Sequence, residues 1–321
     1  MSQVKIEETV VEDRISELPQ DLILSILRFA PIKEAVSTML LSKRWFPIWT
    51  MIPTLQYKDS EDEDNNDPSV CWFLDKSLQL HNAPVIDGLV MQLDPTRLPD
   101  SLYNCATLKP LDLSHKILVD FPSSSCLPSL LALELVCVVY KDDDSPARSQ
   151  LDDDNDAVDT GGCLVMDTPA LNYFEIRDSS RDSYSIENMP CLEKAYISVD
   201  SSPKFDKFIA SLPAVVLSLE LKLHDEVECD YEPDDDLQLL WNQPSYVPSC
   251  LSSQLEIFEW RGYGDETEEE EFLTYILANS KCLKSATISL RPTLGLVEKK
   301  RVTTKLKDIT RISTASQLLF K

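Results

Sequence analysis

The residues best suited to metal binding or general-base chemistry in this 321-residue chain are its three histidines, His81, His115 and His224. Only His224 has further potential ligands nearby, namely Glu228 and Cys229. Structural zinc sites use four ligands, and neither a second histidine nor a CxxC pair completes the set here. The three residues also lie in a strongly acidic, loop-like tract. The sequence therefore predicts no metal site.

Nucleophilic catalysis by a cysteine has equally little support. Such a cysteine needs an activating base, and Cys229 follows His224 by five residues while Cys71 precedes His81 by ten, but no third residue supports either pair. The chain contains no GxSxG, P-loop or HExxH motif. Its carboxylates occur in runs typical of solvated surface, not as pairs in an apolar pocket that would raise a pKa. We therefore expect a non-enzymatic protein without a cofactor.

The bulk composition favours a folded protein. Hydrophobic residues make up 43% of the chain, and the formal net charge of −25 argues against general binding to nucleic acid or anionic membranes. The nine cysteines are odd in number and scattered, which indicates free thiols in a reducing compartment. No apolar signal core and no run of 18 apolar residues is present. We expect a soluble protein of the cytoplasm and/or nucleus that binds neither nucleic acid nor membrane.

The N-terminal block, residues 13–59, contains three short helical patterns. Leu18-Pro19 begins the first pattern, Pro31 ends it, and Ser42 begins the third, which carries Trp45 and Trp49. The apolar residues of the first helix spread over more than half of its circumference, so one face can cover a core and the remainder needs a partner. These residues are Leu22, Ile23, Leu24, Ile26, Leu27 and Phe29.

Two interpretations fit this block: a small independent helical bundle, or a module that docks onto another protein. The order LPxDLILxIL, then KEAVxTMLLSKRW, then IW resembles the F-box, in the form that begins plant F-box proteins with leucine-rich repeats and an FBD tail. The resemblance implies docking onto the Skp-type adaptor, and through it the cullin, of an SCF-type (cullin-RING) ubiquitin ligase. Some apolar residues must serve the F-box core, and the sequence does not separate them from the adaptor-binding ones. The expected adaptor-binding residues are Leu18, Pro19, Leu22, Ile26, Leu27, Val36, Leu41, Trp45 and Trp49.

A weak repeat follows, with apolar residues at positions 1, 4 and 6 and a common step of about 21 to 22 residues. A step of this size with an alternating strand core is typical of a leucine-rich-repeat solenoid, in which each strand buries its leucines against its neighbours. Chance is a competing explanation, because leucine-rich sequences produce this spacing easily. The eight occurrences are Ile86, Leu89, Met91; Leu108, Leu111, Leu113; Leu130, Leu133, Leu135; Leu171, Phe174, Ile176; Leu192, Ala195, Ile197; Ala214, Leu217, Leu219; Leu255, Phe258, Trp260; and Leu283, Ala286, Ile288.

The predicted solenoid has irregular features. Two steps of 41 residues contain the acidic tracts 141–159 and 225–236, and Pro110 lies inside a strand pattern, where it removes a hydrogen-bond donor. After the strand pattern, the chain continues as DPTRLPDSLYNC. The helix that the family usually has near residues 93–98 is missing from this stretch. We therefore expect an abridged or irregular repeat region.

The C-terminal part contains WNQP, VPSCL, FEWRGY and EEEEFLTYILANS ahead of CLKSATI, and it resembles the FBD domain. The acidic run begins a predicted helix, where the helix dipole favours negative charge. Its buried stripe is either Phe272, Tyr275 and Ile276 or Leu273, Ile276 and Leu277. Basic residues follow as Lys299, Lys300, Arg301, Lys305, Lys307 and Arg311, which fit a closing helix with exposed lysines better than a nucleic-acid-binding tail.

Together these patterns predict a mixed α/β protein with five parts. A polar leader occupies residues 1–12, a three-helix F-box residues 13–59, an acidic linker residues 60–70, the leucine-rich-repeat region residues 71–240 and the FBD domain residues 241–321. The expected function is target recognition in an SCF-type ligase, with an unknown protein target held by the repeats and FBD. The alternative is a repeat-based interaction protein outside any ligase, or a truncated paralog that has lost target binding.

Overall fold

The structure is a computed structural model. It describes residues 15, 17–58, 68–92, 98–114, 117–119, 127–140, 168–178, 189–199, 209–210, 212–223 and 241–321. The leader, His115, His224, Glu228, Cys229 and both long acidic tracts lie outside these residues, as does the side chain of Cys71.

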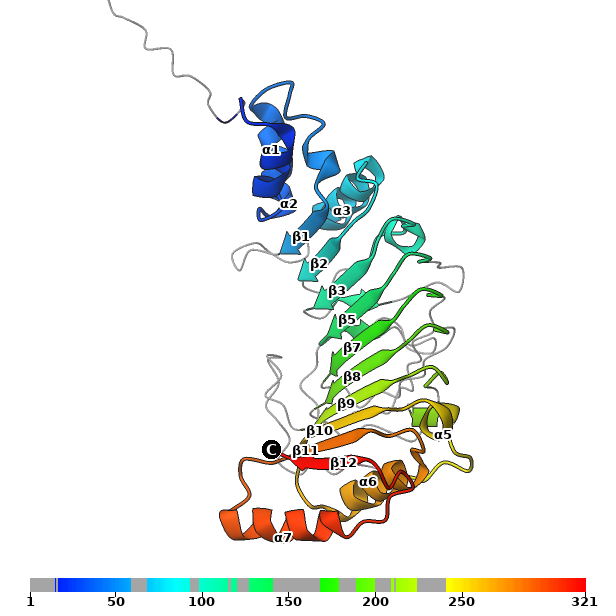
Figure 1. Cartoon of the computed structure of the whole chain (residues 1–321). Helices are drawn as coiled ribbons and strands as arrows, with labels where there is room; N and C mark the ends of the chain where they lie inside the picture. The colour runs from blue at the N-terminus through cyan, green and yellow to red at the C-terminus, as the bar shows by residue number, and fades with distance from the viewer. Residues whose placement is uncertain are drawn as a thin grey trace, which may run out of the picture.

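The chain has a mixed α/β fold, built on one ten-stranded sheet in which every pair of neighbouring strands is parallel. Figure 1 shows an elongated stack of strands with α1 and α2 at one end and α6 and α7 at the other. The strands of this sheet follow one another in chain order, so each one pairs with the next strand of the same sheet. They are β1 (Thr54–Lys58), β2 (Gly88–Gln92), β3 (Pro110–Ser114), β5 (Ala132–Val136), β7 (Tyr173–Asp178), β8 (Lys194–Val199), β9 (Ser218–Leu223), β10 (Ile257–Tyr263), β11 (Ser285–Leu290) and β12 (Gln317–Phe320). A separate two-stranded sheet pairs β4 (Leu118–Val119) with β6 (Val139–Tyr140).

The helices cover the ends and one side of this stack (Figure 1). Their bounds are α1 (Gln20–Leu27), α2 (Ile32–Ser37), α3 (Pro68–Leu80), α5 (Ser249–Ser253), α6 (Thr267–Asn279) and α7 (Leu296–Lys307), with short 3-10 turns η1 (Thr38–Leu40), η2 (Trp49–Met51) and η3 (Leu102–Asn104).

The first helix begins at Pro19, as the sequence predicts, and Pro31, predicted to end that helix, also begins the second one. Pro19 is the N-cap residue of α1 and Pro31 that of α2, where a missing N–H leaves no backbone acceptor unpaired. The third predicted helical segment differs. Its backbone hydrogen bonds run from residue i+3 to i, for example from Trp45 N to the Ser42 carbonyl oxygen and from Ile48 N to that of Trp45. A regular α-helix does not form there, and Pro47, which has no N–H to donate, lies in its middle.

The core of the sheet consists of two rows of side chains, each strand contributing one residue to each row. In register, Leu111 pairs with Leu133 and Leu113 with Leu135, and all four are buried. The whole rows are Leu55, Leu89, Leu111, Leu133, Phe174, Ala195, Leu219, Phe258, Ala286 and Leu318; and Tyr57, Met91, Leu113, Leu135, Ile176, Ile197, Leu221, Trp260, Ile288 and Phe320. Positions 4 and 6 of the predicted repeat are therefore the core-facing residues of the strands, with one exception.

The exception is the sixth occurrence, predicted at Ala214, Leu217 and Leu219. In the structure Leu219 pairs with Ala195 and therefore occupies position 4, not position 6. Counting from it, position 1 is the buried Val216 and position 6 the buried Leu221, while Ala214 is exposed. That prediction is wrong by two residues, because a second set of apolar residues at the same spacing lies just upstream.

The structure also contains strands outside the predicted set. Ile52, Leu55 and Tyr57 have the same spacing and are buried, and β1 pairs with β2 from Leu55 to Leu89. Residues 54–58, which the sequence assigns to the F-box block, thus form the first strand of the sheet. At the other end, β12 adds a tenth strand beyond β11. Pro110 is the first residue of β3, where a strand tolerates proline.

The C-terminal part follows the predicted helix and strand order. In α6, both proposed stripes are buried, from Phe272 and Leu273 to Tyr275, Ile276 and Leu277. The acidic first turn is not uniformly solvated, because Glu269 is fully buried.

One cysteine departs from the expectation of free thiols. Cys137 is disulfide-bonded. Cys105, Cys191, Cys250 and Cys282 are free.

Candidate functional site

The first candidate site is the outer face of α1. Residues four apart lie on the same side of a helix, so Leu22 and Ile26 form one stripe and Ile23 and Leu27 the next. Ile23 and Leu27 are buried in the core, whereas Leu22 and Ile26 are 51% and 56% exposed. The helix therefore has one apolar stripe that stabilises the fold and a second one that faces solvent.

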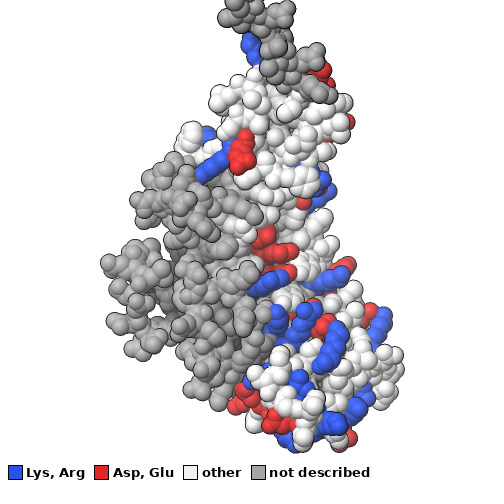
Figure 2. Space-filling view, turned by 90° about the vertical axis from the view of Figure 1, so that its left-hand side faces the viewer, with Lys and Arg blue, Asp and Glu red and all other residues white. Residues whose placement is uncertain are grey.

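Further large apolar side chains of the same block are exposed. Phe29 is 77% exposed, Leu40 81%, Leu41 63% and Phe46 62%. Single exposed apolar residues are ordinary, but several large ones within some thirty residues mark an interaction surface. On the face drawn in Figure 2, the described part of the N-terminal end carries fewer charged side chains than the opposite end.

The nine residues predicted to bind the adaptor fall into three groups. Pro19, Leu22, Ile26 and Leu41 are exposed, and Leu18 and Val36 are partly buried against the core. Leu27, Trp45 and Trp49 are buried in the core, with exposures of 5%, 4% and 4%. All nine residues are apolar, so the sequence does not distinguish them. Only their burial in the folded protein separates the three groups. The exposed Phe29, Leu40 and Phe46 are not among the nine, although Phe29 belongs to the first apolar pattern.

Two polar contacts hold the outer stripe in place. The Arg44 guanidinium donates a hydrogen bond of 2.5 Å to the carbonyl oxygen of Leu18, and Gln20 Nε2 lies 3.3 Å from the sulfur of Met51. The start of α1 is thereby joined to the third segment of the block, which fixes the angle at which the stripe is presented.

The second candidate site is the face of the sheet that points away from the core. There, equivalent residues of neighbouring strands form a row that contains Asp112, Glu134, Glu175, Tyr196, Glu220 and Glu259. Burial, together with the nearby charges of Glu175 and Asp112, raises the pKa of Glu134. Like charges on adjacent strands repel, so this row needs cations nearby.

Arginines of the same face supply part of that charge. Arg177 lies 2.6 Å from Glu175, and Arg261 lies 2.7 Å from Glu220. Arg177 also lies over the ring of Tyr196, 5.6 Å from its centroid. In Figure 2, acidic and basic side chains lie close together in the middle and lower parts of the face shown. The result is a polar, ion-paired face suited to contact with another protein.

The His81 side chain contacts the main chain of the segment that precedes β1. Its Nε2 lies 2.8 Å from the carbonyl oxygen of Ile52, and burial lowers its pKa. Within the described part of the chain, no three His, Cys, Asp or Glu residues are placed to hold a metal ion. No helix there is long and apolar enough to cross a membrane.

Comparison with known proteins identifies both ends of the chain. The F-box domain model matches residues 15–56, and the FBD model matches residues 243–288. A putative FBD-associated F-box protein of Arabidopsis thaliana is 42% identical, with the whole of both chains covered. A putative F-box/FBD/LRR-repeat protein of the same plant is 36% identical over 99% of this chain and 98% of the relative, and another is 35% identical over 96% and 91%. No solved structure matches the chain significantly.

The alignment with the first of these relatives spans 443 positions, more than the 321 residues of this chain, so the relative has stretches that this chain lacks. The similarity nevertheless extends from the exposed stripe of α1 to the C-terminal strands. The chain belongs to the plant F-box/FBD/leucine-rich-repeat protein family.

Proposed function

We propose that this protein is the target-recognition subunit of an SCF-type ubiquitin ligase. The observation that carries the proposal is the solvent-facing apolar stripe of Leu22 and Ile26 inside a block that matches the F-box domain. The F-box binds a Skp-type adaptor, which in turn binds a cullin. All bond-making chemistry then belongs to the partners, and this chain acts by holding a target protein near the ubiquitin-charged enzyme.

Burial refines the residues assigned to the adaptor contact. We assign Pro19, Leu22, Ile26 and Leu41 to the adaptor-binding surface, together with the exposed parts of Leu18 and Val36. Leu27, Trp45 and Trp49 are assigned to the core, because a side chain with about 5% exposure or less offers a partner almost no surface. The exposed Phe29, Leu40 and Phe46 extend the proposed surface.

The parallel sheet is proposed to be the leucine-rich-repeat part. Strands that pair in chain order, with one residue each in two continuous core rows, are what stacked repeats produce. The ion-paired outer face of β5–β10 is the proposed site of target contact, in concert with the FBD. A cytoplasmic and/or nuclear location remains part of the proposal.

The test is binding to a purified Skp-type adaptor. The double variant Leu22→Asp/Ile26→Asp places two charges on the exposed stripe, and we expect it to lose adaptor binding at least a hundredfold. The matched control is Leu296→Asp/Val297→Asp on α7, because those side chains are also highly exposed, at 82% and 83%. Both double variants should unfold at the same urea midpoint as the parent. Failure of the folded parent to bind, or equal binding by both variants, would overturn the proposal.

One observation favours a second candidate. The curated relative contains stretches that this chain lacks, which fits a paralog that binds the adaptor but has lost its target, or a repeat protein acting outside a ligase. Proximity labelling with the parent and with the Leu22→Asp/Ile26→Asp variant separates the three cases. A ligase subunit labels adaptor and target, a paralog without a target labels the adaptor alone, and an independent repeat protein labels the same proteins in both forms.

A further inference from the structure

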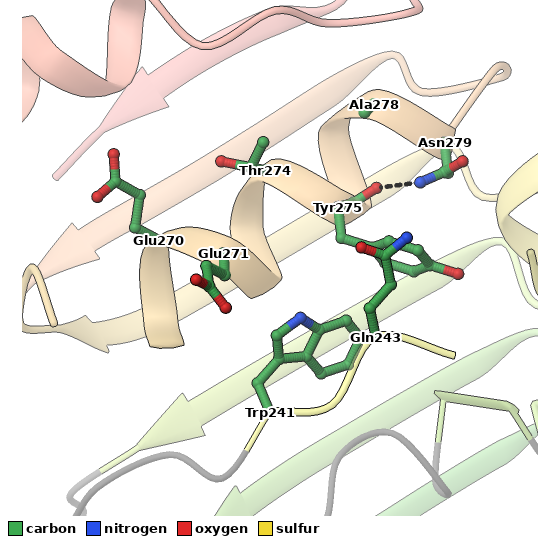
Figure 3. A pocket seen from close by; sticks show the side chains of 8 residues that line it. All are labelled: Trp241, Gln243, Glu270, Glu271, Thr274, Tyr275, Ala278 and Asn279. Carbon is green, nitrogen blue, oxygen red and sulfur yellow. Dashed lines mark hydrogen bonds between the residues drawn. The ribbon is translucent and has the colours of Figure 1, made fainter. Parts of the chain in front are cut away.

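A groove of about 580 Å³ lies in the FBD part, between α6 and the chain segment that begins at Trp241. Trp241 belongs to the WNQP motif, to which neither the adaptor contact nor the sheet face assigns a role. Figure 3 shows Trp241 and Gln243 on one side of the groove and Glu271, Thr274 and Tyr275 on the helix opposite. The volume is within the range of pockets that bind small molecules.

The aromatic wall of this groove is held rigidly. The Trp241 ring lies 5.3 Å from that of Tyr275 and 4.7 Å from that of Phe272, measured between centroids. The Tyr275 hydroxyl donates a hydrogen bond of 3.3 Å to the carbonyl oxygen of Tyr246, and Asn279 Nδ2 donates one of 2.8 Å to that of Tyr275. Since the ring contacts and the Tyr275 hydroxyl bond are already present in the groove, little rearrangement is needed on binding, which lowers the entropic cost of occupancy.

The described residues that line the groove carry charge of one sign. The charged ones among them are Glu270 and Glu271. Glu270 is already neutralised by Lys305, 2.6 Å away. Glu271 is exposed, and among the described residues it takes part in no ion pair; Figure 3 shows its side chain directed toward Trp241. The Trp241 and Tyr275 rings are mostly buried, 9% and 6% exposed, so they offer the groove narrow apolar edges and not open ring faces. The attraction for a cation therefore comes from the exposed carboxylate of Glu271.

We propose that this groove binds a lysine or arginine side chain presented by the target protein, with its charged end beside Glu271 and its aliphatic part along Trp241 and Tyr275. Gln243 lies beside Trp241 on the same wall of the groove, where its amide can hydrogen-bond the main chain of the target segment. The inference deepens the proposed target-recognition function and rests on it for the identity of the occupant. Adaptor binding at the F-box is measured separately, so failure of one does not imply failure of the other.

The test uses the full chain labelled with 15N at its five tryptophan indoles, with the Trp241 signal assigned from Trp241→Phe. The probe is the blocked pentapeptide acetyl-Ala-Ala-Lys-Ala-Ala-amide, and the matched control replaces its lysine with norleucine, which keeps the aliphatic chain and removes the charge. We expect the lysine peptide to shift the Trp241 indole signal in a saturable way and the norleucine peptide to bind at least tenfold more weakly.

Two protein variants complete the test. Glu271→Gln should weaken binding of the lysine peptide about tenfold, whereas Glu268→Gln, which removes a charge from the same helical turn outside the groove, should change it less than twofold. Equal binding of both peptides would show an apolar groove and overturn the proposal. So would the absence of any Trp241 shift, or unchanged binding by Glu271→Gln in a protein whose other four indole signals stay at their parent positions.

Discussion

The guanidinium of Arg291 lies 2.7 Å from a carboxylate oxygen of Glu269, a side chain that is 1% exposed. The second oxygen of Glu269 accepts hydrogen bonds of 2.8 Å from the Gly264 N–H and 3.2 Å from the Glu266 N–H. Arg291 also pairs with Glu266 at 2.8 Å. A buried carboxylate at the first turn of α6 thus joins the end of β10 to the segment that follows β11.

Replacement of Arg291 by methionine should destabilise the FBD part by about 3–5 kcal/mol at neutral pH, because it leaves a buried charge without its partner. Burial already raises the pKa of Glu269, and Arg291 opposes that rise, so the pKa should increase further in the variant. A carboxyl with a higher pKa in the folded than in the unfolded state gains folded-state stability as the pH falls. The difference between variant and parent should therefore shrink as the pH is lowered from 7 toward 5.

Urea unfolding followed by tryptophan fluorescence at several pH values measures this difference. The control is Arg261→Met, whose half-exposed guanidinium should contribute less than about 1 kcal/mol. If the free energy of unfolding of Arg291→Met differed from that of the parent by the same amount at every pH, the role assigned to Glu269 would be wrong.

Gly264 allows the close approach of Arg291. A Cβ atom at this position would lie 2.3 Å from Cζ of Arg291, too close for any non-bonded contact. We expect Gly264→Ala to cost about 1–3 kcal/mol by displacing the guanidinium. Gly295→Ala is the control, since its nearest contact would be an ordinary 3.4 Å from Glu298. Equal unfolding midpoints for the two variants would show that Arg291 can move without loss.

The revised register of β9 gives a direct comparison of two leucines. Leu221 is buried in the core row, and Leu217 is only partly buried. Leu221→Ala should therefore cost about 2–5 kcal/mol, as for other buried leucines, and Leu217→Ala about 1 kcal/mol. Thermal unfolding measures the two losses of stability. A larger loss for Leu217→Ala than for Leu221→Ala would show that the register predicted from the sequence is correct.

His81 should make the junction between the F-box block and the sheet sensitive to acid. Burial lowers its pKa, so below a pH of about 6.5 the unfolded chain binds a proton that the folded one does not, and stability falls. His81→Gln keeps a donor for the Ile52 carbonyl and should remove this loss. Hydrogen exchange of residues 50–57 between pH 7.5 and 5.5 reports it. His115→Gln and His224→Gln serve as controls. If one of these variants, and not His81→Gln, removed the loss of stability at low pH, the effect would belong to that histidine.

Much of this fold could be predicted from apolar spacing. Seven of the eight predicted repeats have their core residues where the spacing places them, because a parallel sheet stacked in chain order keeps the same residues inward in every strand. The spacing alone could not choose between two overlapping fits of the repeat. One fit places Leu217 at position 4, and the other, which the structure has, places Leu219 there. Nor did the spacing reveal β1, because Ile52, Leu55 and Tyr57 directly follow a stronger helical pattern.

The candidate sites were less accessible to prediction. Leu22 and Ile23 are neighbours of similar hydrophobicity, and only the packing of α1 shows which one faces solvent. Likewise, Glu269 belongs to a run of four glutamates, and its burial depends on Arg291, a residue 22 positions away. Long-range contacts of this kind leave no local pattern in the sequence.

The hydrogen bonding of β1 to β2 has a mechanical consequence. Since the strand that closes the F-box block is also the first strand of the sheet, backbone hydrogen bonds join the proposed adaptor-binding end to the described sheet. Nine strand-to-strand steps of about 4.8 Å place β12 roughly 43 Å from β1 along the sheet. A target held near the FBD would then stand at a set distance and orientation from the ligase. The number of strands, more than any single contact, would decide which target lysines come within reach of the ubiquitin-charged enzyme.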